Sequence, residues 1–174
     1  SCVIHGDIND RNVLVAAAGE DGEDGQLEVA GIIDFGDMCF TWRINEIAIA
    51  IAYAVIALHY DKGSAASAGG GGSAASRDEL SEADACAAMA GRYASELDRS
   101  GEALTEDEWR VLPTLIAVRI AVSLSIGAYS SAKDPTNEYL KLTLLPGLTA
   151  LQRLRAIPAD DLEQSLRAAV RKSS

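Results

Sequence analysis

The sequence of 174 residues has few basic residues, few cysteines and no uninterrupted hydrophobic segment of membrane-spanning length. Its 15 lysines and arginines are outnumbered by 26 aspartates and glutamates, which gives a formal net charge of −11. The basic residues form no cluster that could bind a phosphate backbone, so a nucleic-acid-binding protein is not expected. The same charge argues against binding to anionic lipid surfaces, and it is compatible with a cationic small-molecule substrate.

The cysteines and the apolar segments indicate a cytoplasmic protein. Cys2, Cys39 and Cys86 are scattered and show no CxxC or Cys/His ligand spacing, so we expect reduced thiols. The longest apolar run, 47–58, is shorter than the roughly 20 residues that cross a bilayer, and it predicts a buried helix. The sequence shows no basic segment followed by an apolar one, so no signal peptide is expected.

The first third of the sequence predicts a β-hairpin followed by a central helix. Short apolar segments at 13–15 and 27–33 predict two strands. Residues 16–26 between them are acidic and glycine-rich, which predicts a surface loop. They lack the D-x-D-x-D-G pattern of a calcium site, so a plain loop is favoured over a calcium-binding one. Residues 42–60 predict a helix that is apolar around most of its circumference, and such a helix lies in a core.

The rest of the chain predicts a low-complexity insertion and four more helices. Residues 64–76, with the sequence SAASAGGGGSAAS, should form a flexible insertion within one domain. Capping-box patterns start helices at 76–79 and 105–108, and the second helix should kink or restart at Pro113. Further helices should open at 134–136 and at Pro158, the last with Leu162, Leu166 and Val170 on one face. These elements predict an α+β domain that is mainly α.

Three polar residues flank the predicted hairpin. Asp7 and Asn12 precede its first strand, and Asp34 follows its second strand. Residues before the first strand and after the second lie at the same end of a hairpin, so we expect these three side chains to come together. Two carboxylates and an amide suit phosphoryl transfer, in which one carboxylate orients an attacking hydroxyl and oxygen ligands hold Mg²⁺.

The motif His5-Gly6-Asp7-x-x-x-x-Asn12, followed by Ile33-Asp34-Phe35-Gly36-Asp37, resembles the catalytic loop and the metal-binding segment of protein-kinase-like enzymes. With glycine between the histidine and the aspartate, the motif resembles that of the aminoglycoside phosphotransferase and choline kinase-like family, whose members phosphorylate small molecules. The resemblance implies the C-terminal lobe of a protein-kinase-like fold, with a β-hairpin carrying the catalytic loops and a helical bundle.

The resemblance also implies roles for individual residues. Asp7 corresponds to the catalytic base, and Asn12 and Asp34 correspond to the Mg²⁺ ligands. His5 corresponds to a residue that braces the catalytic loop, and Glu46 to an acidic residue that anchors it. GTP or ATP would be the phosphate donor, and the leading acceptor is a hydroxylated amine such as 5-hydroxylysine. An aminoglycoside, choline, ethanolamine and homoserine are alternative acceptors.

Some assignments stay open at this stage. Asp37 could contact metal or substrate, or serve as a loop or capping residue. Trp42 and Arg43 could line a substrate pocket, but packing and a solvated face are the favoured interpretations. His59 is expected to be an ordinary histidine.

The family's N-terminal lobe carries a glycine-rich loop and a lysine on a strand, and neither motif is found in this sequence. The glycines at 69–72 lie among Ala and Ser with no strand or lysine nearby. We therefore expect residues 1–174 to form only the C-terminal lobe, with the N-terminal nucleotide lobe absent. Alone, this lobe should bind nucleotide poorly and turn over slowly or not at all. The alternative is a catalytically inactive lobe that serves as an interaction domain.

Overall fold

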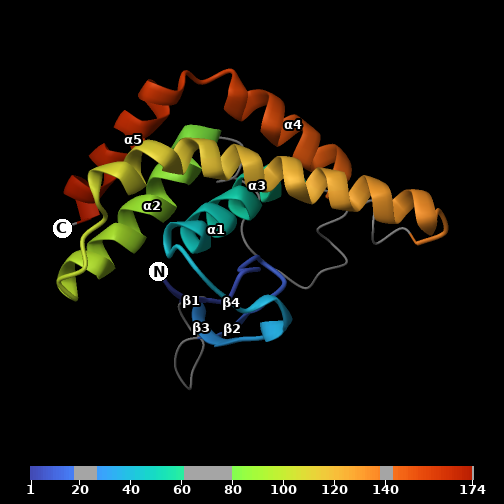
Figure 1. Ribbon diagram of the computed structural model, residues 1–174, viewed down its shortest axis with the longest axis horizontal. Helices are drawn as coiled ribbons and strands as arrows, with labels where there is room; N and C mark the ends of the chain where they lie inside the picture. The colour runs from blue at the N-terminus through green and yellow to red at the C-terminus, as the bar shows by residue number, and fades with distance from the viewer. Residues whose placement is uncertain (18–26, 61–79, 138–142, 174) are drawn as a thin grey trace.

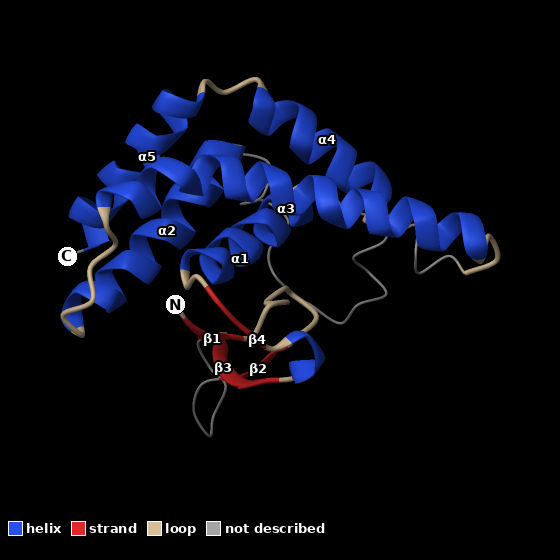
Figure 2. Ribbon diagram, viewed as in Figure 1, coloured by secondary structure: helices blue, strands red, loops and turns tan. Residues whose placement is uncertain are grey.

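The computed structural model describes residues 1–17, 27–60, 80–137 and 143–173. The predicted insertion at 64–76, most of the hairpin loop and the predicted helix start at 76–79 lie outside these ranges. Figures 1 and 2 show a bundle of helices with a small β region below it. The described part of the chain therefore confirms the α+β, mainly α class.

The helices are α1 (Ile44–Ala57), α2 (Glu82–Arg99), α3 (Glu106–Lys133), α4 (Leu144–Arg155) and α5 (Ala159–Ser173). The strands are β1 (Cys2–Ile4), β2 (Val13–Ala17), β3 (Leu27–Ile32) and β4 (Cys39–Thr41), and a short 3₁₀ helix, η1, covers Phe35–Asp37.

The β region consists of two antiparallel ladders. The predicted hairpin is confirmed, since β2 pairs with β3 from Val13–Ile32 to Ala17–Leu27. The pairing of β1 with β4, in which Ile4 lies opposite Cys39, was not predicted. Residues 5–12 and 33–38 therefore both run from one ladder to the other. This topology brings the two predicted catalytic segments together.

Helix α1 lies at the centre of the bundle, as its apolar sequence predicts. Its residues Ile51, Ala52 and Val55 are completely buried. They belong to one hydrophobic core with Leu112, Ile116 and Ile120 of α3, and with Leu162 and Leu166 of α5. The predicted apolar face of the last helix is confirmed, and Val170 packs against the same core.

The helix starts agree only partly with the sequence patterns. The capping box of α3 is confirmed, with Thr105 and Glu108 each binding the other's backbone N–H. Helix α2 begins after Ser81, which forms a capping box with Asp84. Pro113 does not restart α3, which is continuous over 28 residues.

The helix predicted to open at 134–136 is wrong. Asp134 and Asn137 close a turn, with the Asn137 N–H donating to the Asp134 carbonyl at 3.3 Å. The Thr136 hydroxyl donates to the Asp134 carboxylate at 2.8 Å. Asp-Pro-Thr favours turns as well as helix starts, and here the turn forms. The next described helix, α4, begins at Leu144.

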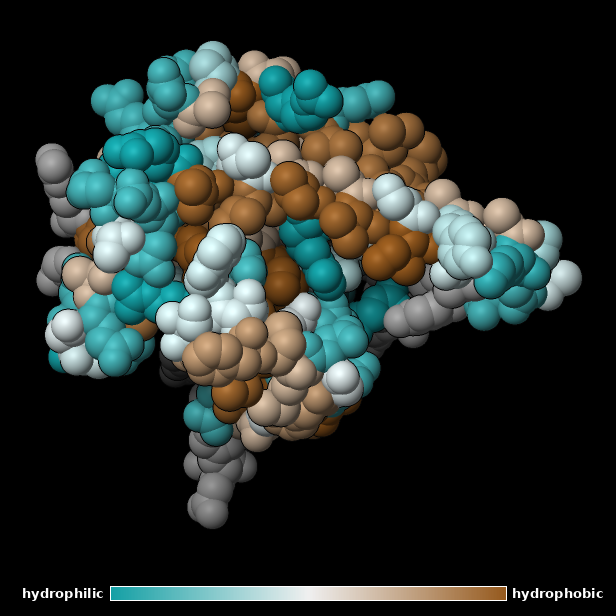
Figure 3. Space-filling model, in the orientation of Figure 1, coloured by the Kyte–Doolittle hydropathy of each residue, from teal (hydrophilic) through white to brown (hydrophobic). Residues whose placement is uncertain are grey.

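Helix α3 exposes apolar side chains along one side. Val118 is 50% exposed and Ile126 is 60% exposed, and brown side chains follow α3 across the face seen in Figure 3. By length and composition alone this helix could cross a membrane, although no uninterrupted apolar run of that length occurs in it. Core helices of soluble proteins meet the same criterion, and the side of α3 that carries Ile116 and Ile120 lies in the core.

Arg43 ties the start of α1 to the start of α3. Its guanidinium donates to both oxygens of Glu108 at 2.8 Å and to the carbonyls of Glu102 and Ala103 at 2.9 and 2.8 Å. The predicted solvated face for Arg43 is therefore wrong, because these acceptors hold the side chain. Trp42 is 67% exposed, so the packing predicted for it is also wrong.

The Arg43 contact makes the stability of the fold pH-dependent. Hydrogen bonds from Arg43 lower the pKa of Glu108 from 4.5 to about 2. A depressed carboxyl pKa stabilises the folded state above the unfolded pKa, and this stabilisation is lost as the pH falls through the folded pKa. Replacing Glu108 by Gln should lower the free energy of unfolding by about 1–3 kcal/mol at pH 7. The difference from wild type should shrink between about pH 5 and pH 2.

Urea unfolding of wild type and Glu108→Gln over this pH range measures the effect. A difference that does not change with pH would contradict the assignment. Glu96→Gln, on an exposed part of α2, is the control and should stay close to wild type.

Candidate active site

Glu46, in the first turn of α1, holds the loop of residues 5–12. The backbone N–H groups of His5 and Gly6 donate to its two carboxylate oxygens, each at 3.0 Å. Gly6 has φ +84°, and a Cβ at this position would collide with the carbonyl oxygen of Asp37. The predicted anchoring role of Glu46 is confirmed, and Gly6 is required by backbone conformation and by space.

His5 joins the two loops. Its Nε2 lies 2.9 Å from the Ile33 carbonyl oxygen, and its Nδ1 lies 3.3 Å from the backbone nitrogen of Asp7. A carbonyl can only accept and a backbone N–H can only donate, so the proton belongs on Nε2. The ring also contacts Phe35, with the ring centroids 5.0 Å apart. The predicted bracing role of His5 is confirmed.

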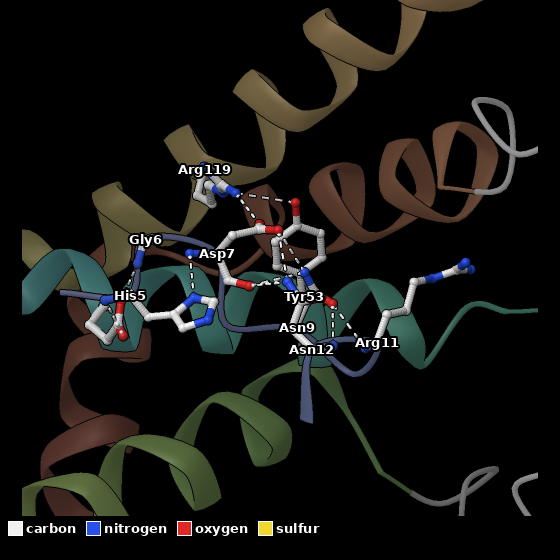
Figure 4. A network of polar contacts seen from close by, with 9 residues as sticks. His5, Gly6, Asp7, Asn9, Arg11, Asn12, Tyr53 and Arg119 are labelled. Atoms are coloured by element: carbon white, nitrogen blue, oxygen red, sulfur yellow. Dashed lines mark hydrogen bonds and ion pairs between the residues drawn. The ribbon is translucent and has the colours of Figure 1, made fainter. Parts of the chain in front are cut away.

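The Asp7 carboxylate is held by three side chains, as Figure 4 shows. Its Oδ1 accepts a hydrogen bond from Arg119 Nη2 at 2.8 Å. Its Oδ2 accepts from Asn9 Nδ2 at 3.0 Å and from Asn12 Nδ2 at 3.1 Å. Asn12 also donates to the Asp7 carbonyl at 2.9 Å. The structure thus brings two of the predicted site residues, Asp7 and Asn12, into direct contact.

Asp34 follows β3 in the second loop. The residue before it, Ile33, donates its N–H to the Asn12 carbonyl at 3.0 Å, so the backbone brings Asp34 next to Asn12. Asp34 is exposed and adopts a left-handed conformation with φ 64°. Among the described residues it is the only non-glycine with positive φ. This conformation is uncommon for residues with a side chain, although aspartate tolerates it better than most, and strained residues of this kind cluster at functional sites.

The oxygen donors of Asn12 and Asp34 fit Mg²⁺, which prefers one or two carboxylates and completes its shell with water and phosphates. The Nδ2 of Asn12 is used on Asp7, which leaves its Oδ1 for another partner. In the described part of the chain, no group of three or more His, Cys, Asp or Glu side chains could hold a metal by itself. A metal at this site would therefore have to complete its coordination shell with oxygens of water or of a bound nucleotide.

A pocket of about 330 Å³ opens beside Asp7. Asp10 and Asp37 line it from the loops, and Tyr53 and Arg119 line it from α1 and α3. Tyr60 also lines it, and burial, together with the nearby Asp10 carboxylate, raises the pKa of its hydroxyl. Polar side chains reach the surface between the brown row over α3 and the β region in Figure 3. Asp37 therefore lies where a substrate could be contacted, which was one of its two open interpretations.

Sequence reasoning missed Arg119 and Tyr53. Arg119 is the only charged residue between Arg110 and Lys133, in a helix that is otherwise largely apolar. That isolation was the available signal. Nothing in the sequence placed this residue opposite Asp7, 112 positions earlier.

Residues 1–80 match the phosphotransferase enzyme family. This segment contains both loops, and Arg119 lies outside it. The match covers the part of the chain that forms the β region and α1. A match to this family implies a kinase-like fold, and the mainly helical architecture with small antiparallel sheets is consistent with it.

The chain is similar to curated hydroxylysine kinases over most of its length. It is 33% identical over 165 residues to the hydroxylysine kinase of Xenopus laevis, covering 94% of this chain and 37% of that protein. Identity to the Mus musculus protein is 31% over 88% of this chain and 34% of that protein. For the Danio rerio protein it is 30% over 94% of this chain and 38% of that protein. The chain thus spans little more than a third of these relatives. No solved structure gives a significant match.

The anchor of the predicted catalytic loop can be tested with Glu46→Gln. Glutamine retains one oxygen and places an amide nitrogen where the second oxygen accepted, so one backbone N–H loses its acceptor. The free energy of unfolding should fall by about 1–3 kcal/mol. Amide hydrogen exchange at His5 and Gly6 should also become faster. Unchanged exchange at both amides would show that Glu46 does not anchor the loop.

Proposed function

We propose that the protein containing this chain is a small-molecule kinase. It transfers the γ-phosphate of GTP or ATP to a hydroxyl of an amine substrate, with 5-hydroxy-L-lysine as the leading candidate. The observation that carries this proposal is the Asp7 carboxylate, fixed by Asn9 and Asn12 and placed at a pocket of small-molecule size. The names of the curated relatives support the choice of acceptor.

Asp7 has room for the substrate hydroxyl. A carboxylate offers about four lone-pair positions, and the described residues fill one on Oδ1 and two on Oδ2. The free position is therefore on Oδ1. A hydroxyl bound there gives its proton to Asp7 while its oxygen forms a bond to the γ-phosphorus. The bond between that phosphorus and the β–γ bridging oxygen breaks, and the nucleoside diphosphate leaves.

We propose that Asn12 and Asp34 are the protein ligands of Mg²⁺. The bound ion would neutralise the negative charge on the phosphates during transfer. Asn12 then links the two halves of the site, because its Nδ2 holds the base and its Oδ1 is free for the metal.

The reaction can be tested with the full-length protein. It is incubated with Mg²⁺, GTP or ATP, and a panel of 5-hydroxylysine, choline, ethanolamine, homoserine and kanamycin, and release of nucleoside diphosphate is followed. Release with 5-hydroxylysine alone is the expected result. Activity with another panel member would reassign the acceptor. No release from a folded protein would support the alternative of an inactive lobe that serves as an interaction domain. We expect residues 1–174 alone to show little turnover, and the same assay tests that.

Replacing Asp7 by Asn should reduce kcat about 10²- to 10⁴-fold, because the amide cannot accept the hydroxyl proton. The fold should persist, since an amide of the same shape keeps most of the contacts. Thermal melting checks the fold. Asp98→Asn, at an exposed position of α2, is the matched control. Full activity of Asp7→Asn would show that another group is the base.

A further inference from the structure

Arg119 has more hydrogen-bond donors than the described protein uses. Its Nη2 donates to Asp7 Oδ1 at 2.8 Å and to the Tyr53 hydroxyl at 3.2 Å. Its Nε is fully buried and has no partner, and Nη1 has no acceptor among the described residues. The guanidinium also lies 5.4 Å from the centre of the Tyr53 ring. Two of its three nitrogens are thus left without an acceptor.

A buried N–H donor without an acceptor lowers the stability of the folded protein, and an arginine carries five N–H donors. A ligand that accepts hydrogen bonds from this guanidinium would offset that cost. Arg119 stands at the wall of the pocket beside Asp7. An anionic group in the pocket would bind at Nη1, because the Nε atom is buried, and a carboxylate suits a guanidinium donor.

The pocket presents charges of both signs. Arg119 and Arg11 supply positive groups, and Asp10 and Asp37 supply carboxylates in addition to Asp7. A simple amino alcohol such as choline or ethanolamine would pair with the carboxylates and leave Arg119 unsatisfied. An amino acid carries both the ammonium and the carboxylate that this lining complements.

We propose that Arg119 is a specificity-determining residue that binds the carboxylate of an amino acid substrate. This inference rests on the proposed function and narrows the acceptor to a hydroxylated amino acid. Arg119 holds the base on Nη2 and would hold the substrate carboxylate through Nη1. The substrate carboxylate would lie at Nη1, on the other side of the guanidinium from Asp7. The hydroxyl of the same substrate would then have to extend to Asp7 Oδ1. A hydroxyl several bonds from the carboxylate, as in 5-hydroxylysine, meets this condition, and a 2-hydroxy acid does not.

Two other roles for Arg119 lead to different results. It could only orient Asp7, or it could bind the transferred phosphoryl group. Either role affects every acceptor alike, with or without a carboxylate. A pair of acceptors that differ only in this group therefore separates the three roles.

The test compares 5-hydroxylysine with its decarboxylated counterpart, 1,5-diaminopentan-2-ol, in the full-length protein with Mg²⁺ and the preferred nucleotide. Wild type should favour 5-hydroxylysine in kcat/KM by about 10- to 100-fold, the value of one charge-assisted hydrogen-bonded pair. Arg119→Met should abolish this preference, with the additional loss confined to 5-hydroxylysine. Arg119→Lys should retain part of the preference. Arg110→Met, on an exposed turn of the same helix, should leave both substrates unchanged.

Several results would overturn the inference. Equal use of the two compounds by wild type would do so without any variant, even if Arg119→Met failed to fold. An equal loss on both compounds in Arg119→Met would assign Arg119 to Asp7 or to the phosphoryl group. If wild type phosphorylates neither compound, the proposed function fails. In that case the affinities of the two compounds are measured by calorimetry. Tighter binding of 5-hydroxylysine by the same ratio of about 10- to 100-fold supports the carboxylate site, and equal binding overturns it.

Discussion

The site depends on the two hydrogen bonds from backbone N–H groups to the Glu46 carboxylate. Glu46 belongs to α1, which is buried at the centre of the helical core. Through Glu46, this rigid helix fixes His5 and Gly6, and these residues start the loop that carries Asp7. Hydrogen bonds from two successive backbone N–H groups to one carboxylate fix both the position and the direction of the loop. The loop therefore keeps its geometry although few of its own side chains are buried.

Contacts to backbone groups connect this anchored loop to the second loop and fix its position. His5 binds the Ile33 carbonyl, and the Ile33 N–H binds the Asn12 carbonyl. Gly6 lies against the backbone of Asp37 so closely that no side chain fits between them. The relative placement of Asp7, Asn12 and Asp34 is thus set mainly by backbone contacts. Surface substitutions elsewhere in the β region should affect it little.

The sequence predicted those features that depend on local patterns. Short apolar segments predicted the hairpin, the apolar character of α1 predicted its central position, and the spacing of Leu162 and Leu166 predicted the buried face of α5. The contact between Asp7 and Asn12 followed from their spacing before a strand. The ladder of β1 and β4 was missed because three-residue strands carry little pattern. The turn at Asp134 was missed because its residues favour two local structures, and the choice between them is made outside the segment.

Arg119 was missed for a different reason: it belongs to a helix of the pocket wall and not to the two loops that carry the motifs. The loops hold the proposed base and the proposed metal ligands, and they are fixed by hydrogen bonds to Glu46 and Ile33. The helices α1 and α3 supply the pocket wall on which an acceptor would lie. Arg119 reaches the loops through one side chain that contacts Asp7, and no backbone bond depends on it. A substitution on α3 can therefore change what the pocket accepts while the loop geometry persists. The loop motifs are similar to those of phosphotransferases and can be found in the sequence. Arg119, the proposed determinant of the acceptor, stands alone in its helix sequence, and its contact with Asp7 is seen only in the folded chain.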